Sequence, residues 1–360
     1  MARGRDRRLT LRPRRETMNE PKIRNMEEFA AVSGISRPTV SKYFHDPQSV
    51  RQSTRQRIEA ALERYDYRPN VYAMNQNRRL TKNIGIVVPY LADPFFAEIA
   101  RNIENLIIAA GFRPILLSSH GDPAQELDNL ESLRLIKPAG VLLAPLGRAS
   151  ESGRIKAFCE DVPTVLFDSN IGELGEAFVG LDNRQSVGLI VDYLCRTGEP
   201  PAFFEMKSPT NPNANKRRAA YLAAMDARGH TPHLIQAEGD GWDFEEIGHR
   251  EGARFIEQRN LPTDTVLCSN DRLAIGFLSA AYELGLRVGL GSGCALRVAG
   301  HDDHPFSRFT CPSLSAVSPG FASDDEKSAE ALFSIIESGQ RPSVRESALF
   351  DGKLSMRGSA

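Results

Sequence analysis

The sequence lacks a long hydrophobic run, and its N-terminal arginines have no apolar segment behind them. No stretch reaches the roughly 18 consecutive apolar residues that a membrane-spanning helix needs, and the arginine-rich start does not have the form of a secretory signal peptide. The 360 residues are 41% hydrophobic and 25% charged, a composition that excludes disorder, collagen and coiled coil. We therefore expect two or three soluble domains in the cytoplasm.

Cysteine is scarce and has no recognisable spacing. The odd number of cysteines, with no C-x-x-C pair and no Cys/His cluster, argues against a disulfide framework and against a zinc site. The seven histidines also lack metal-ligand spacing such as H-E-x-x-H. We expect no metal and no cofactor, and we expect reduced, mostly structural thiols at Cys159, Cys195, Cys268, Cys294 and Cys311.

The motifs of common enzymes are missing as well. There is no P-loop and no G-x-S-x-G, residues 85–93 carry no G-x-G-x-x-G, and the glycine-rich segment 289–293 follows a helical pattern rather than a strand. Glycoside hydrolysis needs two carboxyl groups at a set separation, which no pair of acids in the sequence selects. We expect a protein that is not an enzyme.

Charge is divided unevenly along the chain. Residues 1–82 hold 19 Lys and Arg against 9 Asp and Glu, whereas residues 83–360 hold 26 against 37. Residues 1–20 should form a disordered basic arm, unless translation begins at Met18 and most of the arm is never made. Without residues 1–17 the head still has 12 basic against 7 acidic residues, as expected of a polyanion-binding domain on an acidic body.

Residues 21–68 have the pattern of a helix-turn-helix domain. Asn25 and Glu28 form a start like a capping box, Gly34 ends this short helix, and Ser36 is a good N-cap for a second one. A third helix over 53–65 would complete a small three-helix core. The second helix leaves polar side chains outside, and these suit the edges and phosphates of a major groove, although a solvated face remains the alternative: Arg37, Thr39, Ser41 and Lys42.

From residue 83 onward, short apolar runs alternate with helical segments. This alternation is typical of α/β folds with parallel sheets flanked by helices, and two such series predict two lobes with a cleft between them. Open sheets of this kind bind ligands beyond the carboxyl ends of their strands. The polar and aromatic residues at these ends would suit a neutral polyol: Tyr90, Asp93, Phe95, Phe96, Asp168, Asn270 and Asp302. The two aspartates Asp168 and Asp302 could instead cap helices, His301 could be a ligand donor or a packed residue, and we expect only one of the adjacent phenylalanines to face the cleft.

At several places the chain resembles the lactose repressor (LacI/GalR) family. The similarity lies in F-A-A-V-S-G-I-S-R-P-T-V-S-K-Y-F, in Y-D-Y-R-P-N, and further on in G-x-V-V-P-Y, D-P-F-F, S-N-D and G-H-D-D, and it extends over about residues 22–350. The family implies a helix-turn-helix head, a hinge over 69–82 and a two-lobed body like a periplasmic binding protein. It further implies lobe 1 at about 83–180 and 319–340, and lobe 2 at about 181–318 and 341–360.

The resemblance also assigns roles to residues. It places Asn25, Ser36, Thr54, Tyr67 and Asn70 at DNA. It also puts Gln76 where the hinge helix usually carries a leucine wedge, so Gln76 or Met74 should contact the minor groove. In the body it implies effector contacts for Asn213, Arg217, Trp242 and Phe321. The expected protein is a homodimeric repressor that binds a pseudo-palindromic operator in double-stranded DNA, is nucleoid-associated when bound, and responds to a monosaccharide. A purine or sugar-phosphate co-repressor, an exported sugar-binding protein and an enzyme are the alternatives; the exported protein would need a signal peptide and would lack the basic head.

Overall fold

The computed structural model describes residues 23, 25–45, 47–65, 67, 81–210, 212–319 and 321–360, leaving aside the side chains of residues 45 and 321–325. The chain forms two compact units, Met1–Arg79 and Leu80–Ala360, which we call the head and the body. The predicted hinge contacts at Asn70, Met74 and Gln76 lie outside the described residues. Among the residues that are described, every helix is too short or too polar to span a lipid bilayer.

The head is a bundle of short helices, as the sequence predicted. Asn25 caps the first helix by accepting a hydrogen bond from the Glu28 amide at 2.8 Å, and Gly34 ends it with φ of 64°, a conformation that favours glycine. Phe29, Val40 and Ile58 are fully buried at the centre of the bundle. The elements are α1 (Met26–Ser33), α2 (Arg37–His45), η1 (Pro47–Ser49) and α3 (Gln52–Tyr65).

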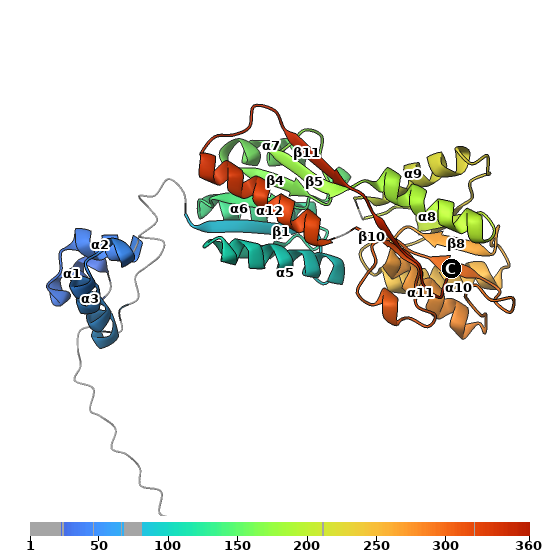
Figure 1. Ribbon diagram of the computed structural model, residues 1–360, viewed down its shortest axis with the longest axis horizontal. Helices are drawn as coiled ribbons and strands as arrows, with labels where there is room; N and C mark the ends of the chain where they lie inside the picture. The colour runs from blue at the N-terminus through green and yellow to red at the C-terminus, as the bar shows by residue number, and fades with distance from the viewer. Residues whose placement is uncertain are drawn as a thin grey trace, which may run out of the picture. The chain divides into compact units, whose positions relative to one another are not determined.

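Lobe 1 of the body is a parallel six-stranded sheet in the order β11-β5-β4-β3-β1-β2. Helices α5 and α12 cover one face and α6 and α7 cover the other, which fits the continuous apolar character of its central strands (Figure 1). The strands are β1 (Asn83–Val88), β2 (Arg113–Ser118), β3 (Gly140–Leu143), β4 (Thr164–Phe167), β5 (Ala177–Leu181) and β11 (Glu346–Phe350). The helices are α5 (Pro94–Ala109), α6 (Pro123–Leu135), η2 (Gly147–Ala149), α7 (Ser152–Asp161) and α12 (Phe321–Ser338).

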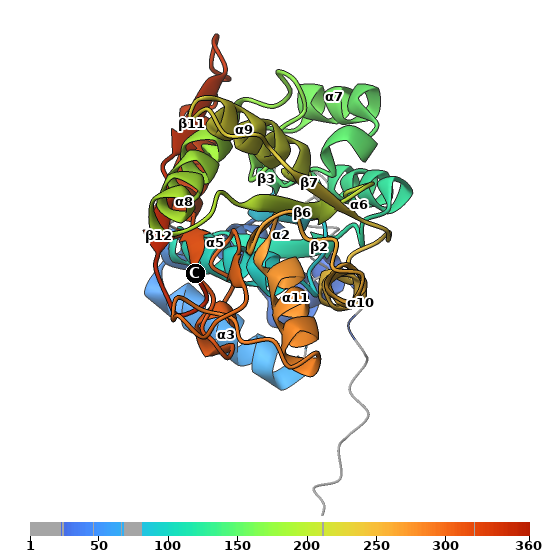
Figure 2. The ribbon, with the colours of Figure 1, turned by 90° about the vertical axis from the view of Figure 1, so that its right-hand side faces the viewer.

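Lobe 2 contains a parallel four-stranded sheet in the order β7-β6-β8-β9 and an antiparallel pair, β10 and β12. Figure 2 shows α8 and α9 on one side of this sheet and α10 and α11 on the other. The strands are β6 (Ala202–Met206), β7 (Leu234–Ala237), β8 (Thr265–Cys268), β9 (Arg297–Ala299), β10 (Ala316–Ser318) and β12 (Lys353–Ser355). The helices are α8 (Asn183–Thr197), α9 (Ala214–Asp226), α10 (Phe244–Glu257), α11 (Asp271–Glu283) and η3 (Ser307–Phe309).

The chain passes between the lobes after β5, after β10 and after β11 (Figure 1). The α/β architecture with two parallel lobes is confirmed, but one boundary differs. Residues 341–360 were assigned to lobe 2, whereas residues 346–350 form β11, which pairs in parallel with β5 at the edge of lobe 1. The open edge of β5 accepts this late strand, and the chain returns to lobe 2 only with β12.

Candidate functional site

The outer face of α2 is the candidate nucleic-acid surface of the head. Ser36, Arg37, Ser41 and Lys42 are exposed and Thr39 is half-buried, so the side chains predicted to face DNA do lie outside the core. Arg37 pairs with Glu27 at 3.6 Å, but both side chains are more than 60% exposed and the pair is easily opened. This face can present a guanidinium, an ammonium and hydroxyl groups to DNA.

Two further residues of the head that were predicted to contact DNA have structural roles. Asn25 caps α1 through its side-chain oxygen, although it is exposed and its amide also donates to Glu28. The ring of Tyr67 is buried and stacks on Phe29 with centroids 4.7 Å apart, so it helps to fill this small core. The expected contact of Tyr67 with DNA remains a prediction. Thr54 is half-buried in the first turn of α3.

In the body, the carboxyl ends of the strands of both lobes converge on a cavity, as predicted for parallel sheets. It consists of two adjoining hollows, which we call the first and the second hollow. The two hollows share four lining residues, and together they form the inter-lobe cavity: Phe95 and Asp168 from lobe 1, and Arg217 and Asp302 from lobe 2.

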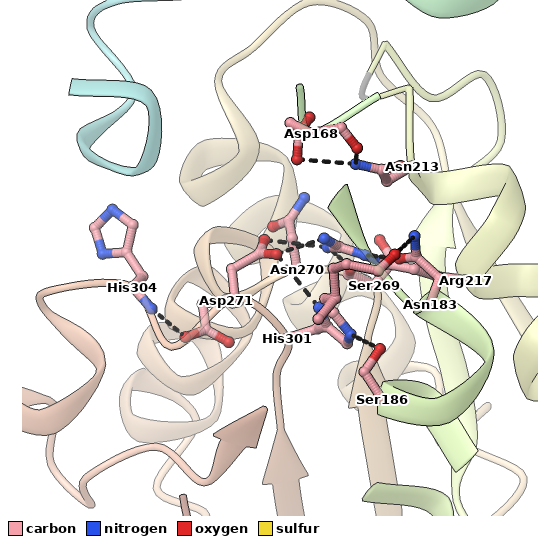
Figure 3. Close-up of polar contacts among 12 residues, drawn as sticks. Asp168, Asn183, Ser186, Asn213, Arg217, Ser269, Asn270, Asp271, His301 and His304 are labelled. Atoms are coloured by element: carbon pink, nitrogen blue, oxygen red, sulfur yellow. Dashed lines mark hydrogen bonds and ion pairs between the residues drawn. The ribbon is translucent and has the colours of Figure 1, made fainter. Parts of the chain in front are cut away.

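The Arg217–Asp302 pair forms the lobe 2 wall of the inter-lobe cavity. The two terminal guanidinium nitrogens of Arg217 donate to the two Asp302 oxygens, and the side chains are only 3% and 12% exposed. Arg217 also donates to the side chain of Asn183 at 3.2 Å and to the carbonyl of Ser269 at 2.8 Å (Figure 3). Burial alone would raise the pKa of Asp302, but Arg217 and the neighbouring His301 hold it below its usual value. Asp302 is thus a fixed, charged acceptor.

His301 lies behind this pair rather than in the cavity lining. Its ring lies 3.0 Å from the Ser186 hydroxyl on one side and 3.3 Å from an Asp302 oxygen on the other. Burial lowers the pKa of His301 to about 4, so the ring is neutral at physiological pH. His301 therefore fixes the orientation of Asp302 from a packed position.

Asp168 forms the lobe 1 wall, directly after β4. Its backbone has φ of 58°, and its carboxylate accepts a hydrogen bond from the Asn213 amide of lobe 2 at 3.0 Å. Burial raises the pKa of Asp168 to about 6, against the attraction of Arg217 and Lys216. Asp168 and Asn213 were both predicted at the site, and the structure brings them together across the two lobes.

Asp93 is the N-cap of α5, and both of its carboxylate oxygens are occupied. One accepts from the Phe95 amide at 3.0 Å, and the other from the Arg272 guanidinium of lobe 2 at 3.1 Å. Arg272 in turn holds both oxygens of Glu245, at 2.7 and 2.6 Å. Arg272 thus ties the lobes together beside the second hollow. Burial raises the pKa of Asp93, although Arg272 opposes this effect.

The aromatic residues that were predicted at the effector site divide into two groups. Phe95 lines both hollows, whereas Phe96 lines only the second and is 2% exposed, so it belongs largely to the core, as we expected of one of the pair. Tyr90 and Trp242 instead stack on each other across the lobes, with centroids 5.3 Å apart, and neither belongs to the described lining of these two hollows. Trp242 also packs against Phe96 at 6.2 Å. The expected stacking of Trp242 on a ligand remains a prediction.

Asn270 lines the second hollow and caps α11 by accepting from the Leu273 amide at 2.8 Å. The side chain of Phe321 lies outside the described part of the chain. Sequence reasoning missed Asn183, Arg272 and His304, because an amide or cation at a helix start and a histidine in a loop resemble solvated residues. Among the described residues, no group of histidine, cysteine, aspartate and glutamate side chains could hold a metal ion.

Comparisons with known proteins agree with this division into head and body. Residues 25–70 match the family described as "Bacterial regulatory proteins, lacI family", and residues 191–360 match the "Periplasmic binding protein-like domain". The chain thus combines a head of the lacI family of bacterial regulatory proteins with a body like a periplasmic binding protein. It is a transcription regulator with a DNA-binding head and a ligand-binding body.

Individual relatives match along most of their length. The ribose operon repressor of Escherichia coli (strain K12) is 27% identical over 338 residues, which are 93% of this chain and 99% of the relative. The repressor PurR of Histophilus somni is 28% identical over 298 residues, which are 81% of this chain and 86% of the relative. A crystal structure of the Lac repressor dimer with operator and the anti-inducer ONPF shares the fold, with a TM-score of 0.79 at 21% identity over 93% of this chain and 98% of that one.

Proposed function

We propose that this protein is a repressor whose affinity for operator DNA is set by a monosaccharide bound in the inter-lobe cavity. The observation that carries the proposal is the placement of two aspartates from different lobes on opposite walls, Asp168 and Asp302, with the ring of Phe95 lining the same space. Sugar hydroxyls donate hydrogen bonds to carboxylates, and the C–H face of a sugar ring packs on an aromatic ring. The name of the ribose operon repressor, a relative of this chain, supports this ligand class.

The DNA-binding part of the proposal depends on the head. Two copies of the exposed α2 face, carried by a homodimer, would contact the two half-sites of a pseudo-palindromic operator. Phosphate contacts should make the affinity for DNA fall steeply with salt. A plot of the logarithm of the binding constant against the logarithm of the salt concentration should have a slope of about −0.9 for each phosphate neutralised. Operator binding, as proposed, requires a cytoplasmic location.

The proposed switch is a shift between arrangements of the two lobes. In the structure the lobes are already linked by the Arg272–Asp93 ion pair and the Asn213–Asp168 hydrogen bond. A sugar that contacts Asp168 on one wall and Arg217 or Asp302 on the other would favour this closed arrangement. Linkage then requires that operator binding changes the effector affinity by the same factor as the effector changes operator affinity.

A purine co-repressor is the second candidate. The name of the purine-type relative PurR favours it, as do a guanidinium and an aromatic ring in one cavity, which also suit a nucleobase. The two aspartates favour the sugar, because a purine offers fewer donors than a polyol.

The test is thermal unfolding of the purified protein with D-ribose, D-glucose and, separately, guanine. A ligand that binds only the folded state adds RT ln(1 + [L]/Kd) to the free energy of unfolding, which is about 2.7 kcal/mol at a ligand concentration of one hundred times Kd. We expect a sugar to raise the unfolding temperature of the wild type and of a control, Asp161→Asn, whose side chain is 63% exposed. Asp168→Asn should lose this response while it keeps operator binding. Stabilisation by guanine alone, or by none of the three, would refute the sugar proposal.

A further inference from the structure

The second hollow extends the inter-lobe cavity away from the Arg217–Asp302 pair. Its far end is lined by Arg272, Phe244 and His304. Figure 3 shows His304 on the opposite side of Asp271 from Arg217. This end of the cavity therefore adds an imidazole ring to a lining that also holds the carboxylates of Asp93 and Asp271.

The hydrogen bonds of His304 fix which ring nitrogen carries the hydrogen. The Phe306 amide donates to Nδ1 at 3.2 Å, so Nδ1 is an acceptor and Nε2 carries the hydrogen. Burial lowers the pKa of His304, although the carboxylates of Asp93 and Glu245 oppose this effect. The residue is 2% exposed, and its Nε2 is buried without a hydrogen-bond partner.

No acceptor among the described residues lies within hydrogen-bond distance of the His304 Nε2. The charged side chains that act on its ring are Asp93, Glu245, Arg272 and the more distant Asp302. Arg272 occupies both oxygens of Glu245 and one of Asp93, and the guanidinium itself can only donate. Nearly all buried polar groups in proteins are hydrogen-bonded, and an exception that lines a ligand cavity calls for a partner from outside the chain.

We propose that His304 is a specificity-determining residue, whose Nε2–H donates a hydrogen bond to an acceptor oxygen of the effector in the second hollow. The inference rests on the proposed function, because it assigns one end of the same ligand. Carboxylates at the first end bind hydroxyl hydrogens, whereas His304 binds an oxygen lone pair. An effector without an oxygen at this position would leave the Nε2–H buried and unpaired, and would bind more weakly.

Two substitutions of His304 separate the roles of its nitrogens. The side-chain oxygen of asparagine lies near the position of Nδ1, so His304→Asn can keep the bond from Phe306 but lacks a donor at Nε2. The amide of glutamine reaches the position of Nε2, so His304→Gln keeps a donor there. Loss of one neutral hydrogen bond to the ligand should weaken binding roughly fivefold to tenfold.

The experiment uses the full chain with D-ribose or D-glucose, whichever stabilises the wild type more, and then with the monodeoxy analogues of that sugar. We expect His304→Asn to bind the parent sugar roughly fivefold to tenfold more weakly than the wild type does, and His304→Gln to bind within about threefold of it. One monodeoxy analogue, which lacks the oxygen that His304 contacts, should bind equally to wild type and His304→Asn, as in a double-mutant cycle. An unchanged affinity for the parent sugar, or the same loss for every analogue, would overturn the inference.

A measurement on the wild type protects the test against variants that do not fold. In protein labelled with 15N-histidine, the parent sugar should move the Nε2–H signal of His304 downfield and slow its exchange with water. A signal that the sugar does not move overturns the inference. If neither sugar stabilises the wild type, the proposed function itself fails, and this outcome is seen before any His304 variant is made.

Discussion

The buried Arg217–Asp302 ion pair leads to a prediction whose size follows from its surroundings. Asp302→Asn keeps the shape of the side chain and removes its charge, which leaves a guanidinium that is 3% exposed without a counter-charge. Removal of one partner of such a pair costs about 3–5 kcal/mol, a large part of the 5–15 kcal/mol by which a folded protein is stable. For a unit of this size, this corresponds to a fall of roughly 6–20 °C in the unfolding temperature.

Thermal unfolding followed by the fluorescence of Trp242, the single tryptophan of the chain, measures this loss in the body. Lys207→Met is the matched control, since Lys207 and Glu238 form a short ion pair of 2.8 Å whose side chains are 58% and 64% exposed. We expect the control to cost less than about 1 kcal/mol. The double variant Arg217→Met, Asp302→Leu should recover most of the stability but not the response to the sugar.

Two results would refute this reasoning. If Asp302→Asn costs no more than the Lys207→Met control, burial does not amplify the loss of the charge. If the double variant is as unstable as the single one, the cost comes from lost packing or from the bond to His301, and not from an unpaired charge.

Three further predictions concern other parts of the chain. Burial raises the pKa of Asp271 in the folded state from 3.8 to about 7, so its contribution to stability is full below pH 3.8 and is lost as the pH rises toward 7. In urea unfolding, the wild type should therefore lose up to roughly 4 kcal/mol of stability relative to Asp271→Asn over this pH range. A stability difference that does not change with pH would contradict the raised pKa. Lys42→Ala should weaken binding to a selected operator duplex by about 1–3 kcal/mol, measured by fluorescence anisotropy, and should weaken binding to a scrambled duplex less. An unchanged ratio of the two affinities would show that Lys42 does not contact bases. Tyr67→Ala should destabilise the head by about 3–5 kcal/mol, which limited proteolysis of the full chain would detect as rapid cleavage of the head. Tyr67→Phe keeps the ring and should resist cleavage. Equal resistance of the two variants would show that the stack on Phe29 does not stabilise the core.

The fold was largely predictable because its signals are local. Apolar runs such as residues 84–88 and 114–117 are too short for buried helices, and each is followed by a helical segment, which is enough to indicate parallel sheets. The place of β11 was not predictable, since its partner β5 lies far away in the sequence and its pattern does not distinguish one sheet edge from another. The sequence pattern does not indicate helix α7, because its polar residues leave it only a weak apolar face.

The candidate site was predictable as a set of residues but not as a set of contacts. Strand ends identify Asp168, Asn270 and Asp302, because the position of a residue after a strand can be read from the sequence. Which side chains pair with one another depends on the distance between lobes, and so the sequence did not show that Trp242 stacks on Tyr90. The same reason hid Arg272, whose partner Asp93 is 179 residues away.

The late return of β11 to lobe 1 has a consequence for biosynthesis. Strand β5 is complete at residue 181, but its outer edge stays unpaired until residue 350 has left the ribosome, by which time most of lobe 2 has been made. An open strand edge is prone to pair with other chains, and long-range pairings of this kind slow folding. The nascent protein thus carries an exposed edge through nearly half of its synthesis, and chaperones that cover unfinished sheets should associate with it between these two points.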